Sequence, residues 1–125
     1  MIDLNKNNEP LDLSYLKEMS GDSAEFIIEM IDLFKTQTPI YIDELQQAIN
    51  GQDWTKAAGV AHKIKPTFVY VGREDAKSHM QMIEDNAHSG KNLDTLPQAC
   101  EEIVAFTKIL YRQLDTARDE LQQQL

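Results

Sequence analysis

The sequence predicts an all-α fold: an antiparallel four-helix bundle with a short additional helix near the N-terminus. Apolar residues recur at steps of three and four through four long segments, which is the spacing of one buried helix face. Glycine, proline and capping residues separate these segments by short turns, and short turns favour antiparallel neighbours. No run of alternating apolar and polar residues is long enough to indicate a sheet.

The N-terminal residues 1–10 are polar and end in Pro10. We interpret them as an arm or the remnant of a linker, and residues 11–125 as the bundle domain. A short helix is expected over residues 11–19, because the following Ser20-Gly21 pair is a typical helix stop. In a bundle of four longer helices, this short helix would cover one end.

The first long helix is expected to begin at a cap on Asp22 and to reach Gly51. Proline lacks an N–H and clashes with the preceding turn, so Thr38-Pro39 is expected to kink or interrupt this helix. Its apolar stripe before and after that point consists of Phe26, Ile27, Met30, Ile31, Phe34, Ile42, Leu45 and Ile49.

The other three long helices have clear boundaries. Asp53 is a good N-cap for a helix from residue 54 to about 69, and Gly72 ends the connection that follows. A further helix over about 73–89 is stopped by Gly90, and the longest covers about 95–123. The inward positions of these last two helices are Ala76, Met80, Ile83 and Ala87, then Leu96, Ala99, Ile103, Phe106, Leu110, Leu114, Ala117 and Leu121.

Composition restricts the class of protein. The 125 residues suit one domain, and the formal net charge is -9. A chain of this charge repels nucleic acids and anionic membranes, and no basic cluster stands out to reverse that expectation. The single cysteine, Cys100, excludes an internal disulfide and fits a reducing compartment. Without an evident signal peptide or membrane span, we expect a cytoplasmic domain, or one on the cytoplasmic side of a larger sensor kinase.

His62 is the candidate functional residue. At about 100° of rotation per residue, it lies roughly 130° from the centre of the apolar stripe of its helix, so it points out of the core. Ala58, Gly59, Lys65 and Pro66 are its neighbours on the outer face. Glycine and proline are the poorest helix formers, costing about 1 and about 3 kcal/mol relative to alanine. Their presence predicts a bare surface on which another protein can approach the imidazole.

Lys65 lies three residues after His62, and side chains at that spacing are neighbours on a helix. An ammonium repels a metal cation but neutralises the oxygens of a phosphoryl group, so this pair suits a histidine that carries phosphate. Pro66 cannot donate a hydrogen bond to the carbonyl of His62, and we therefore expect the helix to be irregular just past the histidine.

These residues resemble the motif of the histidine-containing phosphotransfer (HPt) domain. The family has an Asp-Trp-like helix start, then Ala-His-x-hydrophobic-Lys-Gly, then an apolar run to a glycine. Pro66 departs from it where most members have glycine, and Thr67 stands where serine is common. The resemblance extends over about residues 11–121 and rests first on Asp53-Trp54, Ala61-His62-Lys63-Ile64-Lys65-Pro66 and Gly72.

The resemblance implies a phosphorelay intermediate without kinase activity of its own. His62 would accept a phosphoryl group from the phosphoaspartate of a receiver domain, with Lys65 stabilising its charge, and would pass it to another receiver. A hybrid histidine kinase is one candidate source of such receivers. The domain would need no cofactor, because the receiver supplies magnesium, and we expect a monomer. The expected docking residues are Thr55, Ala58, Gly59, Lys63, Pro66, Val69, Glu84 and His88.

Three other interpretations remain open. The chain could be an HPt-like adaptor that docks receivers without accepting phosphate. It could be a bundle that binds metal or haem through His62, His79 and His88, although His79 is most simply a surface or boundary residue. It could also be a plain structural bundle, which would leave Gly59 and Pro66 on an exposed face unexplained.

Overall fold

The computed structural model describes residues 2–125, and within them it confirms the all-α prediction. The four long helices are α2 (Ala24–Asn50), α3 (Trp54–Tyr70), α4 (Glu74–Ser89) and α5 (Leu96–Gln122). The short helix α1 (Ser14–Ser20) precedes them. One 3-10 turn, η1 (Leu4–Asn8), comes before α1, and another, η2 (Leu93–Thr95), lies between α4 and α5. No helix in this part of the chain is both long and apolar enough to cross a membrane.

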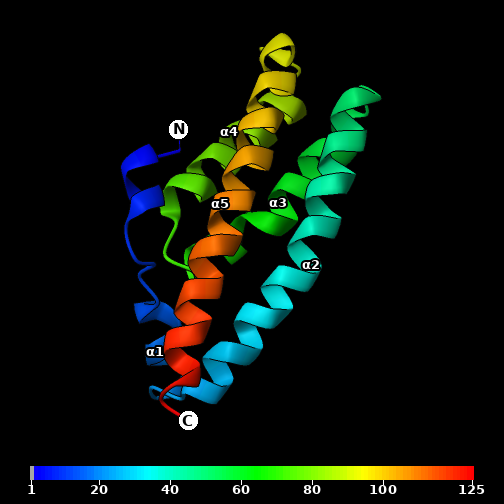
Figure 1. The fold of residues 1–125 in the computed structure, drawn as a ribbon. Helices are drawn as coiled ribbons and strands as arrows, with labels where there is room; N and C mark the ends of the chain where they lie inside the picture. Colours follow the sequence, from blue (N-terminus) through cyan, green and yellow to red (C-terminus); the bar gives the residue numbers. More distant parts are fainter. Residues whose placement is uncertain (1) are drawn as a thin grey trace.

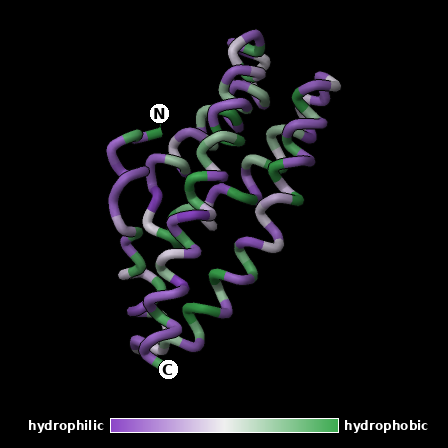
Figure 2. Tube along the Cα trace, in the orientation of Figure 1, coloured by the Kyte–Doolittle hydropathy of each residue, from purple (hydrophilic) through white to green (hydrophobic). Residues whose placement is uncertain are grey.

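The long helices close a ring around one core. Helix α2 packs against α3 and α5, and α4 packs against the same two helices from the other side. Figure 1 shows α2 and α5 running the length of the molecule, with α3 and α4 beside them. Three phenylalanines join three helices across the core: Phe68 meets Phe34 and Phe106 edge to face, with ring centroids 6.1 and 5.8 Å apart. In Figure 2, hydrophobic and hydrophilic residues recur in turn along each long helix.

Helix α2 differs from the expectation at two points. Its N-cap is Ser23, whose hydroxyl accepts a hydrogen bond from the Phe26 N–H at 3.2 Å. Asp22 cannot cap the helix because it adopts a left-handed backbone, with φ 65°, directly after Gly21. The helix also continues through Pro39 without interruption, and Thr38 and Ile42 beside the proline are buried in the core. A kink at Pro39 stays a prediction.

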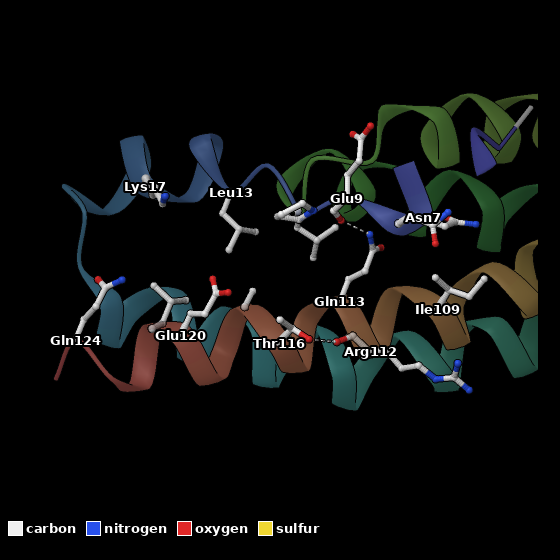
Figure 3. A pocket seen from close by; sticks show the side chains of 15 residues that line it. Asn7, Glu9, Leu13, Lys17, Ile109, Arg112, Gln113, Thr116, Glu120 and Gln124 are labelled. Carbon is white, nitrogen blue, oxygen red and sulfur yellow. Dashed lines mark hydrogen bonds between the residues drawn. The ribbon is translucent and has the colours of Figure 1, made fainter. Parts of the chain in front are cut away.

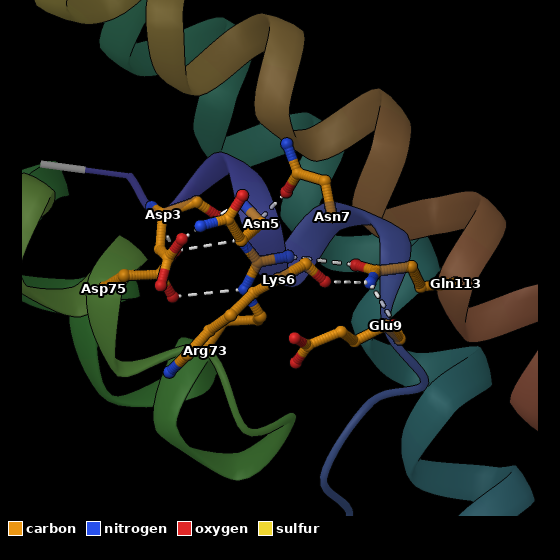
Figure 4. A network of polar contacts seen from close by, with 8 residues as sticks. All are labelled: Asp3, Asn5, Lys6, Asn7, Glu9, Arg73, Asp75 and Gln113. Atoms are coloured by element: carbon orange, nitrogen blue, oxygen red, sulfur yellow. Dashed lines mark hydrogen bonds and ion pairs between the residues drawn. The ribbon is translucent and has the colours of Figure 1, made fainter.

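Residues 3–9 contact the bundle, which the interpretation of residues 1–10 as a polar arm did not anticipate. Arg73, only 1% exposed, donates to the Asp3 carbonyl oxygen at 3.2 Å and to Asn7 Oδ1 at 2.9 Å. Gln113 of α5 donates to two further carbonyls of this segment, those of Lys6 and Glu9 (Figure 4). These contacts are polar, so hydrophobic spacing gave no indication of them. The domain boundary at residue 11 stays a prediction.

Candidate functional site

Helix α3 presents His62 to solvent. The Asp53 carboxylate caps the helix by accepting from the Lys56 N–H at 3.2 Å. Ala57, Ala61, Ile64 and Phe68 then bury one face completely. The opposite face must point outwards, and the His62 side chain on it is 71% exposed.

Helix α4 supplies the groups that hold the imidazole. Nδ1 of His62 lies 3.0 Å from Oε2 of Glu84. The other oxygen of that carboxylate, Oε1, accepts from the Lys65 ammonium at 2.7 Å. Lys65 also donates to Oε1 of Gln81 at 2.6 Å. One carboxylate therefore bridges the histidine and the lysine of α3.

Glu84 is held in its charged form by this arrangement. Burial alone would raise its pKa, but hydrogen bonds from Lys65 and His62 outweigh burial and lower the pKa below its ordinary value of 4.5. An ionised carboxylate only accepts hydrogen bonds, so Nδ1 of a neutral His62 must carry the proton. Its Nε2 then retains the lone pair. The site fixes the tautomer of the exposed histidine.

The outer face of α3 is organised in three rows of residues seven apart, because seven residues return a helix to within about 20° of the starting direction. The histidine row is Thr55, His62 and Val69, on the α4 side. The bare row is Gly59 and Pro66, both exposed. The lysine row is Lys56 and Lys63, on the α2 side, where the Lys63 ammonium lies 4.9 Å from the ring centroid of Tyr41.

The bare row leaves open space next to the histidine. A Cβ built on Gly59 would meet no atom within 4 Å beyond its own helix. The expected irregularity past His62 is not observed as a break, since α3 runs unbroken through Pro66 to Tyr70. The buried residues Ile64 and Phe68 on either side of the proline hold this part of the helix against the core.

Most of the predicted docking residues lie on this face. Thr55, Gly59, Lys63 and Pro66 are exposed, and Val69 is half-buried. Ala58 is an exception: it is 8% exposed, because its side of α3 packs against α4. His88 is exposed one turn beyond Glu84 on α4, and Glu84 rather than His88 contacts the imidazole.

Gln81, whose Oε1 accepts from the Lys65 ammonium, was not among the predicted site residues. Its place on α4, three residues before Glu84, was the available indication, because side chains at that spacing share a face. Lys65 was expected on the outer face; its side chain is only 14% exposed because it reaches across to α4.

His79 is buried, not a surface or boundary residue as expected. It is 3% exposed, and its Nε2 donates to the Ala99 carbonyl oxygen of α5 at 2.8 Å. Its spacing from Ala76, Met80 and Ile83 places it on the inner face of α4. In residues 2–125, no three His, Cys, Asp or Glu side chains are grouped so that they could hold a metal ion.

A groove of about 580 Å³ lies elsewhere, between the N-terminal segment and α5. Figure 3 shows Leu13 and Lys17 on one side of it and Glu120 and Gln124 on the other. None of its lining residues belongs to the three rows or to the groups that hold His62. The exposed histidine and its surroundings are therefore the candidate site.

The site is an exposed histidine whose ring is held by a second helix, on a four-helix bundle. A family model described as "Hpt domain" matches residues 29–124, so the chain belongs to the Hpt domain family. Neither the curated proteins nor the solved structures include a significant match. Membership indicates a phosphotransfer role in two-component signalling, a pathway in which Hpt domains interact with receiver domains.

Proposed function

We propose that the chain is a phosphorelay intermediate in which Nε2 of His62 accepts a phosphoryl group from a receiver phosphoaspartate and passes it to another receiver. The observation that carries this proposal is the contact between Nδ1 of His62 and the Glu84 carboxylate. It leaves Nε2 as the free nitrogen of an exposed imidazole.

The transfer is a single displacement. The Nε2 lone pair forms a bond to phosphorus as the bond from phosphorus to the aspartyl oxygen breaks, and that oxygen leaves with the electron pair as a carboxylate. The imidazole keeps its proton on Nδ1 and gains a positive charge. Glu84 stabilises that charge through the hydrogen bond it already makes. Transfer to the second receiver is the same displacement in reverse.

Lys65 balances the charge of this site. Without it, the Glu84 carboxylate would repel the incoming phosphoryl group. The lysine neutralises Glu84 at 2.7 Å, and its ammonium also adds positive charge near the phosphoryl oxygens. Gln81 is a positioning residue in this scheme, because it holds the ammonium against Glu84.

The receiver would dock over the histidine and bare rows, which carry no long side chain other than His62 itself. Small residues allow close approach, and phosphoryl transfer depends mostly on positioning and charge neutralisation. Magnesium would arrive with the receiver. Docking of this kind is transient, and a monomer suffices for it.

The test is phosphoryl transfer from a panel of phosphorylated, magnesium-loaded receiver domains to the wild type and to His62→Gln. We expect an acid-labile, base-stable adduct on the wild type and none on His62→Gln, with both proteins equally helical. A receiver that binds tightly but transfers nothing to the wild type would contradict the proposal and support the docking-only adaptor.

A further inference from the structure

Charge is segregated on this molecule. The chain has a net charge of -9, yet α3 contains three lysines and no aspartate or glutamate. The other long helices, α2, α4 and α5, each carry more acidic than basic residues. The helix that presents His62 is thus a positive strip on a negative protein, and such a strip attracts an acidic partner locally.

The charges of two of the three lysines are not neutralised by an ion pair within residues 2–125. Lys65 is paired with Glu84, but Lys56 and Lys63 are exposed and take part in none of the ion pairs within residues 2–125. Both lie in the lysine row, two helical turns or about 10 Å apart along the axis. The Tyr41 ring of α2 holds the Lys63 ammonium at that edge of the face.

We propose that the lysine row is an electrostatic guide that docks the acidic, phosphoaspartate-bearing face of a receiver domain across the bare row onto His62. This inference rests on the proposed function. The occupant follows from charge complementarity: the receiver brings an acyl phosphate and the carboxylates that bind magnesium, and their combined negative charge exceeds the positive charge of the magnesium ion. With Gly59 and Pro66 between them, the lysine row and His62 can contact the same partner surface.

A guide of this kind acts on association and not on the chemical step. Charges at the rim of an interface mainly change the association rate and its salt dependence. At about 0.1 M salt the screening length is about 10 Å, so both lysines act on a partner that is close to the face. The chemical groups, Glu84 and Lys65, lie on the other side of the bare row.

The experiment compares Lys56→Gln/Lys63→Gln with the matched pair Lys77→Gln/Lys108→Gln, which removes two exposed lysines from α4 and α5. The donor is the phosphorylated receiver that transfers to the wild type. We expect the first pair to lower kcat/KM about tenfold at low salt through KM, with kcat within about twofold. The loss should shrink to about twofold at 1 M salt, where the screening length is about 3 Å.

Lys56→Arg/Lys63→Arg keeps the charge and should restore the rate. An equal loss in the matched pair would overturn the inference, because it would show an effect of net charge alone. A loss that persists at high salt would also overturn it. Binding of the unphosphorylated receiver to His62→Gln should also weaken as the salt concentration rises, so docking is measured even if transfer is absent. If the wild type does not accept the phosphoryl group, the proposed function is contradicted. If the wild type accepts it and Lys56→Gln/Lys63→Gln has the same kcat/KM at low salt, only this inference is contradicted.

Discussion

At the scale of single residues, the site consists of three side chains, with the Glu84 carboxylate between His62 and Lys65. The carboxylate accepts from His62 and from Lys65 at the same time, and its lowered pKa keeps it ionised at neutral pH. It therefore fixes the tautomer of the imidazole before transfer and can stabilise the positive ring afterwards. Glu84 orients both His62 and Lys65, and their two hydrogen bonds in turn hold the Glu84 carboxylate in place.

Replacing Glu84 tests this balance. Glu84→Gln removes a charge-assisted hydrogen bond worth about 1.5–3 kcal/mol to a ring that gains charge in the transfer. We expect kcat to fall about 10- to 100-fold, measured by single-turnover transfer from a saturating phospho-receiver. Glu102→Gln on the exposed face of α5 is the control and should transfer like the wild type. Unchanged transfer by Glu84→Gln would refute the role of the carboxylate.

Lys65→Ala should slow transfer without abolishing it, because the uncompensated Glu84 then repels the phosphoryl group. If neutralisation of Glu84 is its main task, the double variant Lys65→Ala/Glu84→Gln will lose less than the sum of the two single losses, expressed as activation free energies. Full additivity would mean that the lysine acts on the phosphoryl group independently of Glu84. A rate equal to wild type for Lys65→Ala would remove the lysine from the mechanism.

At the scale of elements, α3 combines a fully buried face with a bare outer row. The bare row lowers helix propensity at Gly59 and Pro66, and the packing of Ile64 and Phe68 compensates. The helix stays continuous for this reason, so propensity alone was a poor guide to its shape.

Side chains added to the bare row should separate stability from function. Gly59→Gln meets open space and replaces a poor helix former, so it should stabilise the fold by about 0.5–1 kcal/mol in urea unfolding. The same variant should lower kcat/KM for transfer at least tenfold by obstructing the receiver. Pro66→Gly keeps the row bare and should transfer within about threefold of the wild type. Full transfer by a stably folded Gly59→Gln would count against docking over this row.

The elements were largely predictable because each long helix carries its own apolar spacing and its own boundary residues, such as the N-cap Asp53 and the C-terminal Gly90. His62 could be found for the same reason, since an exposed histidine beside glycine and proline departs from the local pattern. Glu84 of the neighbouring helix was expected beside the histidine and does contact the imidazole, but the other contacts between helices could not be found in this way. Gln81 and the burial of Lys65 depend on how α3 and α4 pack, which no spacing within one helix reveals.

At the scale of the whole molecule, Arg73 ties the N-terminal segment to the bundle. Its guanidinium pairs with Asp75 at 2.8 Å, donates to Gln113 of α5 at 3.0 Å and lies 4.6 Å from the Phe106 ring centroid. The segment it holds is polar, so hydrophobic spacing gave no indication of these contacts. Residues 3–9 therefore contribute to stability although they lie outside the matched family region.

Acid should loosen this network. Burial raises the pKa of Asp75, but hydrogen bonds from Arg73 and from the Asp3 N–H outweigh it and lower the pKa below its ordinary 3.8. A lowered folded pKa contributes stability above pH 3.8 that is lost as pH falls through the folded value. Urea unfolding against pH should show this acid loss in the wild type and a smaller one in Asp75→Asn. If the free energy of unfolding falls equally with decreasing pH in both proteins, Asp75 does not cause the loss of stability in acid.

The most direct test of the whole account is to locate the phosphoryl group by nitrogen-15 and phosphorus-31 NMR on the protein phosphorylated by a receiver. We expect a single phosphohistidine at His62, with the N–P bond at Nε2 and the proton retained on Nδ1 toward Glu84. A phosphoryl group on Nδ1, or on His88 in place of His62, would contradict it.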